Sequence, residues 1–397
     1  ASNPGIQQHL NAGRMYPDYL SELSSRVANP AQSLQALTVG SIAYGEYEDA
    51  DWRSFARTLG HPSSFSRSGL GIWNSIKPEV VEFGGDDFVS HATPHDVGTP
   101  ECGQEFYPEL VRTTMYPPGP AYARDDVGTS FAAPKVTRIA ALIQEALPEE
   151  SCLLYRALIV QSARWPAWTN QVPYEARKDI VRRIGYGVPD VERATTNSDF
   201  RTTLITSGDR FITAGGCHIY QVPIPAEIRR PKDEYDIRIE VTLSYAAEPR
   251  RTRRNRRRYL STWVDWISSK IDEPLNIFHR RAIKTEEDTE DAGSAFRWTI
   301  GSRTNIGAVP DVSRNAGTVQ KDWTVVKSNS LPEDFCIAIV GHQGWSNDPE
   351  ATATYALAVS LEVVGKEIPI YERLRTSVDQ LEIEVEAEAE IEVEVLG

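Results

Sequence analysis

The chain has 397 residues, of which 40% are hydrophobic and 25% are charged, and its formal net charge is −14. This composition is typical of a globular protein with a large core and two or three domains, and it excludes a chain that is disordered throughout. The negative charge disfavours nucleic-acid binding, and no run of 18 apolar residues is present. We therefore expect neither a nucleic-acid partner nor a membrane partner.

Four cysteines are spread over the chain, at Cys102, Cys152, Cys217 and Cys336. They form no C-x-x-C pair and have no histidine at ligand spacing, which disfavours a zinc site. So few cysteines in so long a chain favour a reducing compartment, and we expect a cytoplasmic protein.

In chain order, the first hundred residues predict part of an α/β domain. Residues 7–32 are polar and irregular, whereas residues 34–42 form an apolar run typical of a strand buried in a parallel sheet. Residues 44–63 predict an exposed loop. From residue 86 to residue 124, Pro, Gly and polar residues predict a long surface loop, which either walls a binding cleft or is a solvated insertion.

The stretch Gly128-Thr129-Ser130-Phe131-Ala132-Ala133-Pro134 precedes a helical pattern that runs to Leu147. Apolar residues recur at helical spacing after Ser130, so we expect a buried helix whose N-terminus lies at this serine. A serine on a Gly-containing turn at a helix start exposes its Oγ and offers a backbone N–H to an oxyanion, as acyl transfer requires. The alternative is a serine that caps an ordinary core helix.

Two further helices are predicted after the serine helix. Cys152 to Ala163 follows the turn and cap signals of residues 148–151, and residues 174–184 form a short basic helix that ends at Gly185. Trp165 and Trp168, which lie between these helices, are expected to pack in the core.

The serine stretch resembles the nucleophile motif of the subtilisin-like serine proteases, the subtilases, in which G-T-S-x-A-x-P opens a buried helix. Five other segments resemble subtilase segments in the same order: Ala1–Gly5 (A-G-N-x-G), Leu37–Ser41 (a buried strand), Ser64–Gly69 (F-S-x-x-G), Lys77–Gly84 (K-P-D-V-V-A-P-G) and Gly185–Asp190 (G-x-G-x-x-[ND]). The chain departs from the family at Ser2, where Gly is usual, and at Glu82 and Phe83, where Ala and Pro are usual.

The resemblance implies a fold, an activity and two site residues. Residues 1–197 are expected to form the C-terminal half of a subtilisin-like α/β domain, three-layered around a parallel sheet. The activity implied is peptide-bond hydrolysis by a serine endopeptidase. Ser130 inherits the role of nucleophile, and Asn3 that of the side chain that completes the oxyanion hole.

The resemblance also implies where the catalytic base lies. In subtilases the catalytic Asp and His precede the Asn segment, so we expect both upstream of Ala1, in an N-terminal half of the same protein that acts as a partner. One alternative is a local triad built from the segment His91 to Asp96. Another is a non-catalytic fragment or pseudoprotease that acts as a binding or scaffold module.

No cofactor is expected. The chemistry of the family uses no metal, and although many members bind structural calcium, the chain has no D-x-[DN]-x-[DN]-G loop.

The second half of the chain changes to strand patterns. Residues 236–247 alternate strictly between apolar and polar residues, which is the period of a half-buried strand. Further strands are predicted at residues 218–225, 323–326, 336–340 and 355–364. Residues 198–366 thus predict an antiparallel β-sandwich domain. We interpret His218, His279 and His342, which are isolated, as structural.

Two charge runs complete the sequence. Residues 250–258 contain seven arginines, and residues 382–394, within an acidic tail at 367–397, contain seven glutamates that alternate with Ile, Val and Ala. The Arg run either binds phosphates or a carboxylate-rich partner, or is a solvated loop. The tail either adds to a sheet as an edge strand or is a disordered appendage, and the two runs can also pair with each other.

Overall fold

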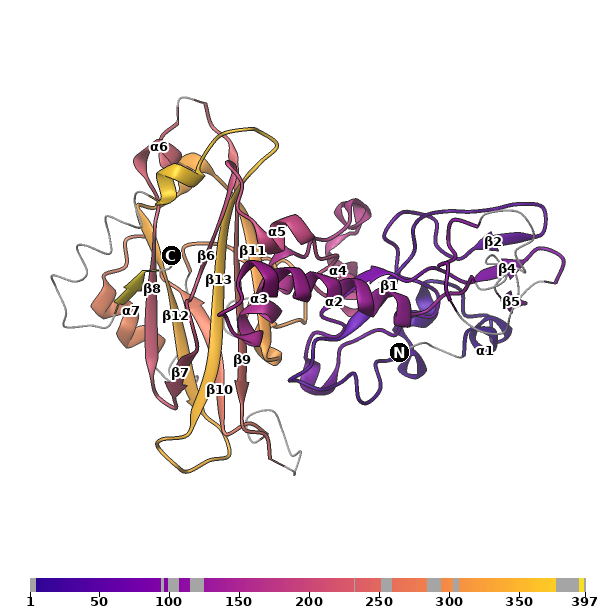
Figure 1. Cartoon of the computed structure of the whole chain (residues 1–397), viewed down its shortest axis with the longest axis horizontal. Helices are drawn as coiled ribbons and strands as arrows, with labels where there is room; N and C mark the ends of the chain where they lie inside the picture. Colours follow the sequence, from indigo (N-terminus) through magenta and orange to yellow (C-terminus); the bar gives the residue numbers. More distant parts are fainter. Residues whose placement is uncertain are drawn as a thin grey trace. The chain divides into compact units, whose positions relative to one another are not determined.

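The computed structural model describes residues 5–93, 96–98, 107–114, 125–231, 233–250, 259–283, 294–302, 307–375 and 393–395. The chain divides into two compact units (Figure 1). The first unit comprises Ala1–Leu142 and Ser162–Val191, and the second comprises Ile143–Gln161 and Glu192–Gly397. Together they give a mixed α/β fold with parallel and antiparallel sheets.

A parallel pair of strands forms the centre of the first unit. β1 (Val39–Ile42) pairs with β3 (Val80–Phe83) in the register Val39↔Val80 to Ile42↔Phe83. Ile42 and Val81 pack against Ile180 and Ile184 of α4 (Arg177–Ile184). The strand predicted at residues 34–42 is thus confirmed from Val39 onward, and the basic helix before Gly185 is confirmed as α4 with the preceding 3-10 turn η6 (Tyr174–Ala176).

The exposed loop predicted at residues 44–63 holds only in part, because Tyr44, Glu46 and Leu59 are exposed whereas other residues of the segment are not. This segment contains β2 (Trp52–Ser54), which pairs with β4 (Phe88–Ser90), and β4 pairs with β5 (Val97–Gly98). Phe55 and Ala56 are buried. This burial depends on the carboxylate of Asp86, which is distant in sequence. Asp86 accepts hydrogen bonds of 2.7 Å from the backbone N–H groups of Ala56 and Ser64, so these groups are paired although they are buried.

The other irregular predictions for the first unit hold only in part. The segment predicted to be irregular, residues 7–32, contains most of α1 (Ile6–Asn11) and the 3-10 turns η1 (Asp18–Ser21) and η2 (Leu23–Ser25). A further 3-10 turn, η3, spans Ile72–Asn74. Within the predicted surface loop, Phe88 and Leu110 are buried, and residues 94–95, 99–106 and 115–124 lie outside the described residues.

The two long helices are confirmed, with different burial from that expected. α2 spans Thr129–Ala146 and α3 spans Cys152–Ser162. α2 buries one stripe, formed by Ala132, Val136, Ile139 and Ile143, and leaves residues such as Ser130 exposed. It is therefore half-buried, and the buried helix predicted from the apolar spacing holds for one face only. Two shorter helical segments follow, η5 (Ala167–Gln171) and α5 (Val191–Thr195). No helix in the described ranges is long and apolar enough to cross a membrane.

The second unit contains two sheets that share one hydrophobic core. One sheet has the order β10-β12-β8-β14 and the other β11-β9-β13-β6, with β7 also paired to β13. The strands are β6 (Arg201–Ile205), β7 (Arg210–Thr213), β8 (Cys217–Pro223), β9 (Asp236–Ala247), β10 (Thr262–Ser268), β11 (Val319–Lys327), β12 (Asp334–Gln343), β13 (Thr352–Val364) and β14 (Val393–Val395). Trp266 and Ile337 of the first sheet and Ile239 and Leu357 of the second belong to the same buried cluster.

The strands predicted in this unit are confirmed, although β11 and β12 are longer than predicted. Short helical segments connect them: α6 (Ala226–Arg229), α7 (Leu275–Ala282), η9 (Arg314–Ala316) and η10 (Ser328–Ser330). α7 places Phe278 and Ala282 against Ile219 and Ala338 on the outer face of one sheet.

Helix α3 covers the outer face of the other sheet through polar side chains. Arg156 donates hydrogen bonds to Ser244 Oγ (2.9 Å) and to the carbonyl of Tyr245 (2.7 Å). Lys321 donates to the carbonyls of Val160 (3.1 Å) and Gln161 (2.9 Å), which lie at the last turn of α3. These bonds explain why both faces of β9 are buried although its sequence alternates.

We expect Arg156→Lys to lower the free energy of unfolding by about 1–3 kcal/mol, because a single ammonium cannot replace the forked guanidinium and leaves buried acceptors unpaired. Urea unfolding measures the change. Arg138→Lys, at an exposed position of α2, is the matched control. Equal stability of the two variants would contradict a role for Arg156 in fastening α3.

The edge-strand alternative for the acidic tail is confirmed for three residues. β14 pairs in parallel with β8, in the register Val393↔Ile219 to Val395↔Gln221. The remaining tail residues from 376 onward lie outside the described residues, as do residues 251–258 of the Arg run.

Deleting residues 381–397 is expected to increase self-association, since it uncovers the backbone N–H and C=O groups along the edge of β8. Sedimentation at low and high salt measures both the association and the contribution of charge. If the truncated and complete chains sediment alike at every salt concentration, the tail is a solvated appendage.

Candidate active site

Ser130 lies at the carboxyl end of the parallel strands. It is the second residue of α2, and the preceding Gly128 donates its N–H to the carbonyl of Gly84 (2.8 Å), directly after β3. Gly84 in turn donates to the carbonyl of Ile42, the last residue of β1 (3.2 Å). A Cβ at Gly84 would lie 2.5 Å from the Gly128 carbonyl oxygen, so this approach requires glycine. The turn thus occupies the edge at which α/β sheets carry their binding sites.

The environment of Ser130 suits a nucleophile. The residue is exposed while its neighbours Gly128 and Thr129 are buried. Its backbone N–H belongs to the first turn of α2, where N–H groups have no acceptor within the helix and the helix dipole favours negative charge. This group can therefore donate to an oxyanion that forms on a carbonyl bound at the serine.

No base contacts Ser130 within the described part of the chain. His91 Nε2 lies 3.4 Å from Glu48 Oε1, and His9 stacks on Tyr19 with ring centroids 5.1 Å apart. The local triad imagined for His91 to Asp96 can be followed only in part, because Pro94 and His95 lie outside the described residues. Asn3 also lies outside the described residues, so its role stays a prediction.

A buried ion pair positions the two strands that lead to the serine. Lys77 contacts Glu79 and donates to the carbonyl of Ala36 (2.8 Å), while Glu79 accepts the backbone N–H of Thr38 (2.8 Å). Both charged side chains are almost fully buried, and they join the residues before β1 to those before β3. The sequence motif K-P-E-V-V therefore has a structural role here that its spacing alone did not reveal.

The segment Gly185 to Asp190 meets this same motif. Tyr186 donates its N–H to the carbonyl of Glu79 (2.8 Å), and Val81 donates to the carbonyl of Gly187 (3.0 Å). Gly185 has a φ of +56°, and a Cβ there would lie 2.5 Å from the carbonyl oxygen of Glu79. Two segments that are distant in sequence are thus adjacent in the fold.

Phe83, which stands where the subtilase pattern usually has proline, contacts a residue of the serine helix. The Nζ of Lys135, on α2, lies 4.3 Å from the centroid of the Phe83 ring. The aromatic residue that replaces the usual proline therefore contacts the serine helix five residues after Ser130.

The first unit also contains two buried carboxyl groups, Asp86 and Glu109, and a partly buried one, Asp87. Burial raises the pKa of Asp86 to about 6 and the pKa of Glu109 to about 7, although each accepts backbone hydrogen bonds that favour the charged form. Burial and the charge of Asp86 raise the pKa of Asp87 to about 7. Glu109 accepts the N–H groups of Tyr44 (2.9 Å) and Gly45 (2.5 Å), so this carboxylate and that of Asp86 organise backbone and do not face Ser130 as its base.

The raised pKa values predict how stability depends on pH. Between about pH 4 and pH 7 the folded state holds protons that the unfolded chain has released, so stability should fall as the pH rises through this window. Burial lowers the pKa values of His9 and His61, which act in the opposite direction below about pH 6.5. Comparison with Asp87→Asn isolates one carboxyl group from these opposing contributions.

We expect Asp87→Asn to lose less stability between pH 5 and pH 8 than the wild type, by at most about 1.4 kcal/mol per pH unit. Thermal unfolding across this range measures the difference. Asp51→Asn, at an exposed carboxyl group, is the control and should follow the wild type. Parallel curves for Asp87→Asn and the wild type would contradict a raised pKa at Asp87.

Comparison with known proteins agrees with this geometry. Residues 18–187 match the sequence profile of the Subtilase family. Uncharacterized protein y4bN of Sinorhizobium fredii (strain NBRC 101917 / NGR234) is 28% identical over 376 residues, which cover 91% of this chain and 82% of that protein. The matched profile includes β1, β3, the Ser130 turn and the segment that ends at Gly187.

Residues 18–187 are thus similar to the Subtilase family, and this family suggests a serine peptidase. Within the described residues, no group of three or more His, Cys, Asp or Glu side chains is arranged to hold a metal ion.

Proposed function

We propose that this chain supplies the nucleophile of a subtilisin-like serine endopeptidase. The observation that carries the proposal is the exposed Ser130 at the start of α2, held at the carboxyl ends of β1 and β3 by the hydrogen bond from Gly128 to Gly84. Ser130 Oγ attacks the scissile carbonyl, and its proton passes to a histidine that an aspartate orients. The Ser130 N–H and the Asn3 side chain hold the oxyanion, which collapses to an acyl-enzyme as the histidine gives its proton to the leaving amine. Water, deprotonated by the same histidine, then attacks the acyl group, and a second oxyanion collapses to release the acid and return the proton to Ser130.

The His and the Asp are proposed to lie upstream of Ala1, in a segment of the same protein. The order of the subtilase motifs supports this, and so does the lack of a base at Ser130 among the described residues. The partners proposed are a peptide substrate and that upstream segment, in the cytoplasm. We propose no cofactor for the reaction.

The fold proposed around this activity has three parts. Residues 1–197 are the C-terminal half of a three-layer subtilisin-like domain, residues 198–366 are a β-sandwich, and residues 367–397 are an acidic tail. The parallel pair β1–β3 supports the first part, and the core shared by two sheets supports the second.

Hydrolysis of a casein substrate by the full-length protein, and separately by this chain, tests the proposal. We expect the full-length protein to cleave casein and this chain alone to be nearly inert. Cleavage of casein by this chain alone as fast as by an active full-length protein would contradict a base upstream of Ala1.

A second function is favoured by one observation, the absence of a base from the described surroundings of Ser130. If the full-length reading frame encodes no Asp and His segments before Ala1, the chain is a non-catalytic subtilase-like module. Inactivity of the full-length protein towards casein would agree with that outcome.

A further inference from the structure

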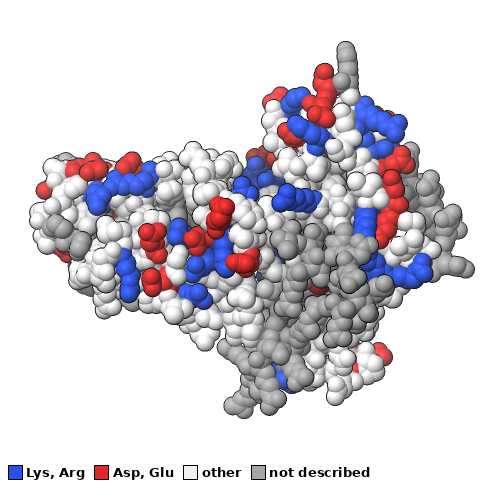
Figure 2. Space-filling view, turned by 180° about the vertical axis from the view of Figure 1, so that it is seen from behind, with Lys and Arg blue, Asp and Glu red and all other residues white. Residues whose placement is uncertain are grey.

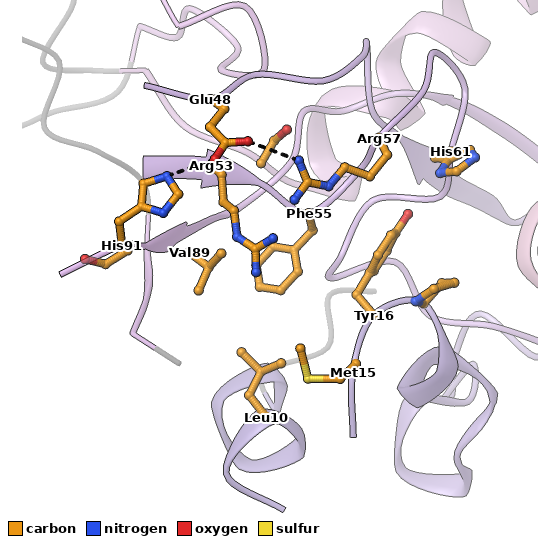
Figure 3. Close-up of a pocket in the computed structure, with 13 residues that line it drawn as sticks. Leu10, Met15, Tyr16, Glu48, Arg53, Phe55, Arg57, His61, Val89 and His91 are labelled. Atoms are coloured by element: carbon orange, nitrogen blue, oxygen red, sulfur yellow. Dashed lines mark hydrogen bonds and ion pairs between the residues drawn. The ribbon is translucent and has the colours of Figure 1, made fainter. Parts of the chain in front are cut away.

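A cavity of about 560 Å³ lies in the first unit (Figure 3). Its walls come from four segments that are separate in sequence: the end of α1 with residues 15–17, residue 48, β2 with residues 55–61, and β4 with residue 91. The volume lies within the range of about 300–1,000 Å³ that is usual for ligand pockets. Neither Ser130 nor its turn is among the described lining residues, so the proposed reaction leaves this cavity without a role.

The cavity contains an unusual concentration of basic groups for so acidic a chain. On the face seen in Figure 2, the described basic and acidic side chains are interspersed. The cavity, in contrast, is lined by Arg53, Arg57, His61 and His91 and by a single described carboxylate, Glu48. Its formal charge is therefore positive even with both histidines neutral.

Most of these groups already have partners. Arg57 lies 2.5 Å from Glu46 and 3.5 Å from Glu48, and Glu48 also lies 3.4 Å from His91. Arg53 is different, because within the described residues its guanidinium has neither an ion pair nor a hydrogen bond. Figure 3 draws the guanidinium beside Val89 and overlapping the ring of Phe55, and Arg53 lies opposite Val89 in the register of β2 and β4.

Part of the cavity that Arg53 lines is apolar. Leu10, Phe55 and Val89 are buried residues of its lining, and Met15 is an exposed one. A guanidinium beside apolar surface binds an anion more strongly than one in open water does. Its planar fork matches a carboxylate with two parallel hydrogen bonds.

We propose that this cavity binds a peptide carboxylate next to an apolar side chain, with Arg53 as the residue that recognises the charge. The carboxylate comes either from an acidic side chain or from the C-terminus of the peptide. That the ligand is a peptide rests on the proposed function, while the preference for a carboxylate rests on the cavity alone.

Binding is measured on the Ser130→Ala form of this chain, so that no cleavage consumes the ligand. The probe is acetyl-Leu-Phe-Glu-amide, compared by calorimetry with acetyl-Leu-Phe-Gln-amide, which has nearly the same shape without the charge. We expect the glutamate peptide to bind at least about tenfold more tightly, and Arg53→Gln to remove this preference. Arg138→Gln removes one exposed arginine from the same unit and should keep the preference.

Acetyl-Leu-Phe with a free carboxyl terminus and its amide identify the source of the carboxylate. A preference for the free acid that also depends on Arg53 assigns the C-terminus, and its absence assigns the acidic side chain. Equal binding of the Glu and Gln peptides, together with equal binding of the acid and the amide, would overturn the proposal. So would an equal loss of the preference in the Arg53 and Arg138 variants.

The two proposals can fail separately. Carboxylate-selective binding by a protein whose full-length form does not hydrolyse peptides would contradict the proposed function and retain the site. Hydrolysis by the full-length protein without carboxylate-selective binding would contradict the carboxylate site and support the proposed function.

Discussion

Ser130→Ala is expected to lower kcat for peptide hydrolysis by the full-length protein about 10⁶-fold, a size borrowed from subtilisin itself. The nucleophile and its base act as a unit, so removing the hydroxyl removes the acyl-enzyme route and leaves only oxyanion stabilisation and substrate binding. Steady-state hydrolysis of a fluorogenic peptide measures the loss.

Thr137→Ala is the control for this experiment, because Thr137 is an exposed hydroxyl residue on the same helix, two turns after the serine. Its kcat should match that of the wild type. A loss below about tenfold in Ser130→Ala would show that another residue carries the attack.

Asn3→Ala in the full-length protein is expected to lower kcat by about 10²–10³ with little change in KM, again a size known from subtilisin. The resemblance of Ala1–Gly5 to the oxyanion segment motivates this prediction. An oxyanion donor acts mainly in the transition state, so its removal lowers kcat and kcat/KM together.

Asn11→Ala, at an exposed position in α1, is the matched amide control and should leave both constants unchanged. A loss of less than about threefold in Asn3→Ala would mean that Asn3 does not donate to the oxyanion.

Much of the secondary structure is predictable because the periodicity of the sequence is strong. The alternation over residues 236–247 predicts β9 with its observed bounds, and the apolar spacing after Ser130 predicts α2. Weaker patterns were missed. β6 and β7 have only five and four residues, and β6 and β10 bury polar residues, among them Thr202 and Thr262.

Burial of part of the segment 44–63, including Phe55 and Ala56, could not be predicted for a different reason. Its backbone is satisfied by carboxylates far along the chain, Asp86 for Ala56 and Ser64, and Glu109 for Tyr44 and Gly45. Polar composition indicates exposure only when no such partner exists.

Only part of the candidate site can be predicted from the sequence. The motif around Ser130 identifies the serine and its helix start, because adjacent residues determine the local geometry of a turn. The ion pair of Lys77 and Glu79 and the cavity around Arg53 depend on contacts between separate segments, so no local pattern marks them.

Labelling with a fluorophosphonate tests the central claim most directly, because the probe forms a covalent bond only with an activated serine. The full-length protein is labelled and digested, and the modified peptide is identified by mass spectrometry. The account predicts a single adduct on Ser130 in the full-length protein and almost none in this chain alone. An adduct on another residue, or labelling of this chain as strong as that of the full-length protein, would contradict it.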